Sequence, residues 1–68
     1  MVARQAIVPR FMLTIKGPNF EDVGDTELPR LPREGDNIET KYGTCIVTHV
    51  EPLAEHEQYR GKITCRLP

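Results

Sequence analysis

Two stretches near the ends of the chain alternate apolar and polar side chains, which is the period of a β-strand with one buried face. In residues 9–16, Phe11, Leu13 and Ile15 fall on one side, and the residues between them fall on the other. In residues 62–67 the same alternation turns three apolar residues inward, namely Ile63, Cys65 and Leu67. We therefore expect a strand near each end of the domain.

Residues 44–50 are rich in β-branched side chains and predict a further strand. Because Tyr42-Gly43 is typical of a turn, we expect residues 36–41 and 44–50 to form a tight hairpin. The strand is apolar on both faces, which predicts a central or doubly covered position. These apolar residues are Cys45 and Val47 on one face and Ile46 and Val50 on the other.

The strands around residues 45 and 63 are expected to pair antiparallel. A register that sets Cys45 opposite Cys65 also sets Val47 opposite Ile63, and it brings the inward apolar residues of both strands to one side. A slip of one residue would turn the inward side chains of one strand outward, whereas this register keeps the apolar residues of both strands on the same side.

Residues 17–35 contain three prolines and three glycines and predict a long irregular stretch. Structureless loops of this length are uncommon, so the stretch is either a functional loop or contains a short strand around residues 20–23. Its acids favour a solvated loop, with contact to a basic partner as the alternative. They are Glu21, Asp22, Asp25 and Glu27.

Residues 52–60 have the features of a short helix. Pro52 suits a first turn, acids follow early, Arg60 comes late, and Gly61 is placed to terminate the helix. Because two turns are marginal on their own, a plain loop is the alternative.

The 68 residues suffice for one small β domain, residues 1–68, with one core. A core this small is often supported by a staple, a metal or a partner subunit, so we expect self-association. The pattern predicts a mainly β fold: a small, strongly bent antiparallel sheet or SH3-like barrel of four to five strands, with the short helix at 52–60 as an optional addition.

In its layout the chain resembles SH3-like barrels, because residues 17–35 and their acids take the place of the long first loop of such barrels. The aromatic residues that line the peptide groove of SH3 domains are not matched, since the chain has no Trp. The available rings are Phe11, Phe20, Tyr42 and Tyr59. The resemblance therefore implies a small barrel without recognition of proline-rich peptides.

Cys45 and Cys65 are either two buried thiols or one disulfide. Pro9 and Arg10 interrupt the first apolar stretch before it reaches the length of a signal-peptide core, so we expect a cytoplasmic location and favour buried thiols. No stretch is long enough to predict a membrane span.

The residues for catalysis or metal binding are few. The chain has no Ser, and both cysteines are expected to face inward, where thiols are inert. Positions four apart on a strand are separated by about 13 Å, so Cys45 and His49 cannot share a zinc ion. We therefore predict no enzyme, no catalytic residue, no metal and no cofactor.

The net charge of −1 gives no overall attraction to nucleic acid or membrane. Bases are nevertheless concentrated toward the two ends of the chain. If the two terminal strands are neighbours, four of these bases form a stripe on the outer face that could contact phosphates. We call Arg10, Lys16, Lys62 and Arg66 the basic stripe.

The sequence names no partner, substrate or process. The small core and the two apolar faces of residues 44–50 favour a non-catalytic protein-interaction module that associates with itself. The alternative is a nucleic-acid-binding small barrel that uses the basic stripe.

Overall fold

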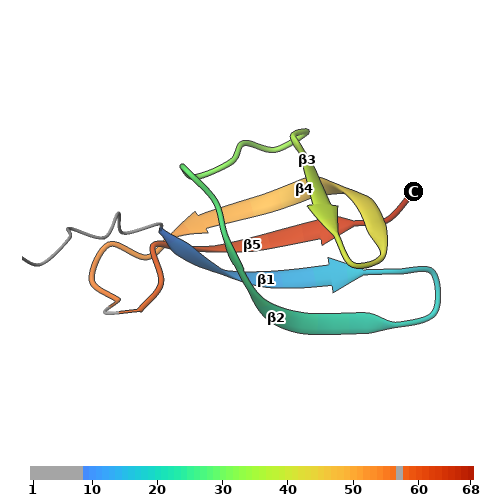
Figure 1. The fold of residues 1–68 in the computed structure, drawn as a ribbon, viewed down its shortest axis with the longest axis horizontal. Coiled ribbons are helices and arrows are strands. Elements are labelled where there is room, and N and C mark those ends of the chain that lie inside the picture. The colour runs from blue at the N-terminus through green and yellow to red at the C-terminus, as the bar shows by residue number, and fades with distance from the viewer. Residues whose placement is uncertain (1–8, 57) are drawn as a thin grey trace, which may run out of the picture.

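The computed structural model describes residues 9–56 and 58–68. These residues form one five-stranded sheet in the order β2-β1-β5-β4-β3 (Figure 1). The strands are β1 (Arg10–Lys16), β2 (Glu21–Glu27), β3 (Asn37–Thr40), β4 (Gly43–Pro52) and β5 (Gly61–Arg66). The prediction of a mainly β fold with a small, strongly bent sheet is confirmed.

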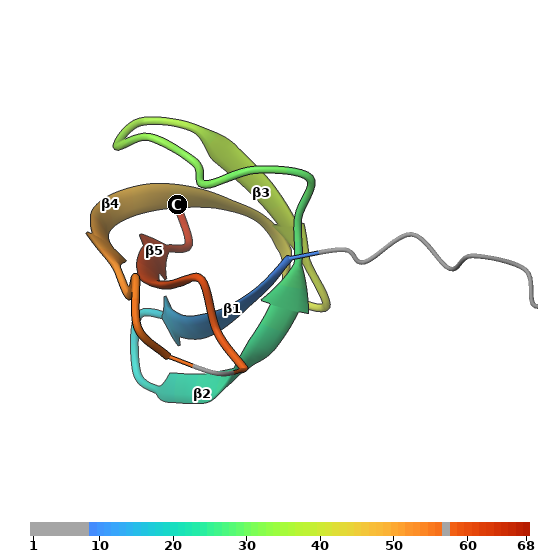
Figure 2. The same cartoon turned by 90° about the vertical axis from the view of Figure 1, so that its left-hand side faces the viewer.

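The sheet curls into a half-barrel, and its strands surround a common interior (Figure 2). Eight apolar side chains are buried on the concave side, and no polar side chain of the described residues is buried with them. The buried residues are Phe11, Leu13, Ile15, Ile38, Cys45, Val47, Ile63 and Cys65. The inward residues predicted for the two terminal strands are therefore confirmed, apart from Leu67, which is partly buried against this core.

One pairing differs from the expected antiparallel sheet. β1 and β5 pair in parallel, with Leu13 opposite Ile63, whereas the other three pairings are antiparallel. Parallel neighbours need a long crossover, and β2, β3 and β4 with their turns supply it.

β2 lies within the stretch predicted to be irregular, so this stretch does contain a strand. Gly17 donates its N–H to the carbonyl of Phe20 at 2.9 Å, which closes a tight turn after β1. The strand continues to Glu27, beyond the short segment around residues 20–23 that the sequence indicated.

The predicted hairpin is present between β3 and β4. Gly43 has a φ of 107°, which L side chains rarely adopt. The Thr40 hydroxyl accepts a hydrogen bond from the Tyr42 N–H (3.1 Å) and donates one to the Gly43 carbonyl (2.8 Å), so the turn is closed from within.

The register predicted for β4 and β5 is wrong. Val47, rather than Cys45, lies opposite Cys65, and a bulge at Thr48 shifts the pairing so that Val50 lies opposite Ile63. The Thr48 hydroxyl donates to the Thr64 carbonyl at 3.3 Å. Because the extra residue reverses the alternation, Val50 turns inward against the core, whereas Ile46 stays on the outer face and is 41% exposed.

The short helix predicted at 52–60 is wrong, and no helix occurs in the part of the chain that the structure describes. The Leu53 N–H donates to the Arg60 carbonyl (3.1 Å), so the β4–β5 hairpin extends into this segment. His56 Nδ1 accepts hydrogen bonds from the N–H groups of Gln58 and Tyr59 (3.1 Å each). Such bonds from a side chain to the backbone compete with helix formation. Among the described residues, none forms a helix long and apolar enough to cross a membrane.

Cys45 and Cys65 form a disulfide with their Cα atoms 5.6 Å apart, which is the second of the two alternatives that the sequence left open. The two cysteines are diagonal neighbours on the concave face, because Val47 occupies the position opposite Cys65. Both are fully buried. The disulfide supplies the staple that so small a core requires.

Candidate binding site at the opening of the half-barrel

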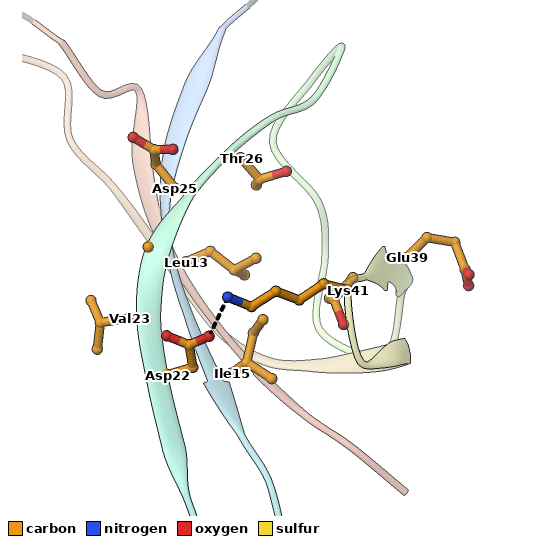
Figure 3. Close-up of a pocket in the computed structure, with 10 residues that line it drawn as sticks. Leu13, Ile15, Asp22, Val23, Asp25, Thr26, Glu39 and Lys41 are labelled. Carbon is orange, nitrogen blue, oxygen red and sulfur yellow. Dashed lines mark ion pairs between the residues drawn. The ribbon is translucent and has the colours of Figure 1, made fainter.

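The half-barrel is open between its two outer strands, β2 and β3, which are not paired with each other. A groove of about 340 Å³ lies at this opening. Leu13 and Ile15 form its apolar floor, β2 forms one wall, and residues 39–41 form the other. Figure 3 shows Lys41 extending across this groove to Asp22, with Leu13 and Ile15 beside it.

Asp22 connects the two sides of the opening. Its carboxylate accepts a hydrogen bond from the Tyr42 hydroxyl (2.7 Å) and pairs with Lys41 Nζ (3.0 Å). We call Asp22, Lys41 and Tyr42 the Asp22 cluster. Its members lie at the surface, where ion pairs contribute little stability, so the contact across the opening can break at low cost.

The hydrogen bond from Tyr42 is the main reason that the pKa of Asp22 lies below its usual range, and Lys41 lowers this pKa further. The same contacts with Asp22 raise the pKa of Lys41 and the pKa of Tyr42. Each shift favours the protonation state in which the Asp22 cluster holds together.

Exposed aromatic rings lie at one end of the opening. Phe20 and Tyr42 are 42% and 45% exposed, and their ring centroids are 4.9 Å apart. The Phe20 ring also covers Gly17, where a side chain would collide with it. These rings extend the apolar surface from the groove toward the β1–β2 turn.

β2 retains unpaired backbone groups along the opening. The Leu28 N–H donates to the Pro9 carbonyl (3.1 Å), and the Gly17 N–H donates to the Phe20 carbonyl at the other end. In an antiparallel ladder this register assigns the even-numbered residues of β2 to bonds with β1. The N–H and C=O groups of the odd-numbered residues therefore point to the free edge. These residues are Glu21, Val23, Asp25 and Glu27.

The structure assembles the basic stripe, because β1 and β5 are neighbours and Lys16 lies opposite Arg66. Acids on the adjacent strands offset it. Three antiparallel pairs each join a base of the stripe to an acid, and Arg66 alone lies opposite an uncharged residue, Ile46. The three pairs are Arg10–Glu27, Lys16–Glu21 and Lys62–Glu51.

Arg10 is the most strongly engaged base of the stripe. Its guanidinium donates to Glu27 at 3.1 Å and lies 3.7 Å from Asp25. The hydrogen bond to Glu27 and the charges of both carboxylates raise the pKa of Arg10. Asp25 also accepts a hydrogen bond from Tyr59 (3.2 Å), so Arg10 belongs to a contact that ties the β4–β5 loop to β2.

The cysteines and histidines are not brought together as a reactive site. The disulfide removes both thiols as nucleophiles and as metal ligands. Within residues 9–56 and 58–68, no three His, Cys, Asp or Glu side chains gather in a way that could hold a metal ion.

The sequence indicated the residues of the opening only in part. The sequence predicts Asp22 in a solvated acidic loop, Lys41 in a strand of the hairpin and Tyr42 in its turn. The acidic run followed by a residue of high β propensity, Val23, is the signal that could have suggested an edge strand.

Comparison with known proteins finds no match for this chain among family models, curated proteins or solved structures. The interpretation of the site therefore depends on its own geometry.

Proposed function

We propose that this chain is a non-catalytic protein-interaction module that binds an extended segment at the opening of the half-barrel. The observation that carries the proposal is the free edge of β2 next to an apolar groove. Strand addition at such an edge gains affinity from backbone hydrogen bonds and specificity from pockets for alternate side chains. β2 offers unpaired backbone groups at its free edge, and the groove lies beside it.

Self-association stays a prediction, but the small size of the core no longer supports it. It was expected because the core is small, but the Cys45–Cys65 disulfide stabilises the domain without a partner. A second β2 is also a poor partner for the first, because four of its seven residues are acidic and none is basic.

An NMR titration with short extended peptides, combined with sedimentation velocity over a wide range of protein concentration, tests the proposed function. We expect amide shifts at β2 on addition of at least one peptide, or reversible association that perturbs the same amides. A chain that stays monomeric and binds no peptide of any charge would contradict the proposal.

A cytoplasmic location also stays a prediction. Structural disulfides are typical of oxidising compartments and rare in the cytosol, so the Cys45–Cys65 bond counts against this location. Alkylation of the protein in intact cells, which distinguishes thiols from a disulfide at these positions, tests it.

Nucleic-acid binding is the second candidate function, and the adjacency of β1 and β5 favours it. A fluorescence-anisotropy titration against random-sequence DNA and RNA at low and physiological salt tests it. Binding through the basic stripe must weaken steeply with salt and disappear in the double variant Lys16→Glu, Lys62→Glu. Unchanged affinity of this variant would eliminate the stripe as the binding surface.

A further inference from the structure

We propose that the occupant of the opening is a cationic extended peptide, with basic residues alternating with apolar residues, which pairs with β2 as a sixth strand. This inference rests on the proposed function and specifies the chemistry of the partner. Its evidence is the facing of the β2 side chains, the space above Gly24 and the charges around the groove.

The facing of β2 defines what each side of an added strand would meet. On the outer face, the added strand lies beside Glu21, Asp25 and Glu27, with exposed Val23 among them. On the inner face it lies beside Asp22, Gly24 and Thr26. Because side chains alternate across a strand, one set of partner residues faces carboxylates and the other set enters the groove.

The inner face of β2 has room for an apolar side chain. Gly24 lies opposite Leu13, and a Cβ added at Gly24 would meet no atom within 4 Å. The open space at Gly24 adjoins the floor formed by Leu13 and Ile15. A valine or similar side chain of the partner can enter above Gly24 and contact these two residues.

The charges select a basic partner. The outer face of β2 carries three acids and no base, namely Glu21, Asp25 and Glu27. In the groove itself, the Asp22 carboxylate is paired with Lys41. A carboxylate can accept several hydrogen bonds, so Asp25 and Glu27 can receive a partner's ammonium groups while Arg10 stays bound to them.

The Asp22 cluster must open to admit the partner. Lys41, whose side chain is 70% exposed, places its ammonium group on the Asp22 carboxylate and crosses the opening (Figure 3). Asp22 lies on the inner face, beside the apolar residues of the partner, so Lys41 returns to solvent when these residues enter the groove. An ion pair at the surface contributes little stability, and its loss therefore costs little.

The test uses two peptides of equal length, one alternating lysine with valine and the other alternating glutamate with valine. We expect the lysine peptide to bind the oxidised full chain, and the glutamate peptide to bind at least about tenfold more weakly, because its charges are repelled. Added salt should weaken the binding of the lysine peptide. Amide shifts should centre on the odd-numbered residues of β2.

Gly24→Val supplies the decisive variant, because its side chain occupies the space that the partner would fill. The space at Gly24 is open, so the variant should fold and should lose binding of the lysine peptide. Ile46→Thr is the control, since Ile46 is exposed on β4 and lies outside the groove, and it should bind like the wild type. If Gly24→Val does not fold, the amide shifts of the wild type decide the question.

Three results would overturn the inference. They are equal binding of the two peptides, undiminished binding by folded Gly24→Val, and amide shifts that lie away from β2. Equal binding at the β2 edge would leave the proposed interaction module intact and refute only the preference for a cationic partner. Failure of every peptide together with a monomeric chain would refute the proposed function itself.

Discussion

At the scale of single residues, the surroundings of a side chain decide its role more than its type does. Asp22 and Asp25 belong to the same acidic run, yet they point to opposite sides of β2 and meet different partners. The Asp22 carboxylate accepts a hydrogen bond from Tyr42 and pairs with Lys41 across the opening, whereas Asp25 contacts Arg10 and Tyr59. Composition could indicate an acidic segment, but only the pleat of the strand divides it into two sites.

The contacts of Asp22 predict how stability changes in acid. The pKa of Asp22 is lower in the folded chain than in the unfolded chain, chiefly because of the hydrogen bond from Tyr42. The carboxylate therefore adds stability above its unfolded pKa of about 4, and this contribution is lost as the pH falls through the folded value. Thermal unfolding measured from neutral to acid pH should show a steeper loss for the wild type than for Asp22→Asn.

Tyr42→Phe is the control for this prediction, because it removes the largest cause of the shift and leaves Lys41 in place. Its loss of stability in acid should lie between those of the wild type and Asp22→Asn. The effect is small in all three proteins, because the groups are exposed. Identical pH profiles for the three would contradict the assigned role of Asp22.

Two glycines should respond oppositely to the same substitution. Gly43 has a φ of 107°, so Gly43→Ala should destabilise the domain by about 1–2 kcal/mol. Gly24 has open space and no positive φ, so Gly24→Ala should leave stability unchanged or raise it by about 0.5–1 kcal/mol. Chemical denaturation measures both changes, and a destabilised Gly24→Ala would show that the inner face of β2 is less open than described.

At the scale of elements, the sequence was informative where alternation is regular. β1 and β5 were predicted from their alternation, and the turn residues before β4 located the hairpin. β2 was predicted only as a short segment, because an edge strand with four acids lacks an apolar stripe. The β4–β5 register was predicted wrongly because the bulge at Thr48 interrupts the alternation of inward and outward side chains. No local feature of residues 44–50 indicates this bulge.

The bulge predicts that β4 tolerates one deletion better than its neighbours. Removing Thr48 leaves Val47, His49 and Val50 opposite the same residues of β5 and restores a regular ladder, so Val50 would still face inward. Deletion of Ile46, in the regular part of the strand, is the control, because it turns buried side chains of β4 away from the core or forces a new register. We expect the Ile46 deletion to cost at least about 1 kcal/mol and the Thr48 deletion to cost less. Urea denaturation measures both losses, and the reverse order would contradict the assigned position of the bulge.

At the scale of the whole molecule, one small core supports the entire half-barrel. The buried residues come from β1, β3, β4 and β5, whereas β2 contributes none and attaches through its pairing with β1. The molecule therefore combines a stapled core with an edge strand that has no buried side chain. Such a division suits a module that must keep its shape while one edge exchanges partners.

The disulfide should decide whether the half-barrel is stable under reducing conditions. It links positions separated by 20 residues, and closing a loop of that length is worth about 3 kcal/mol in the chain-entropy model. That is a large share of the stability expected for a domain this small. The double variant Cys45→Ala, Cys65→Ala should therefore unfold at a markedly lower urea concentration than the oxidised wild type.

Reductant provides the internal control, because it should lower the unfolding midpoint of the wild type and leave that of the double variant unchanged. A wild type insensitive to reductant would contradict the structural role of the bond. The same samples also test the division between core and edge. Since β2 is bonded to β1 rather than to the stapled strands, its amides should exchange with solvent faster than those of β4 and β5 in the oxidised protein, and reduction should narrow that difference.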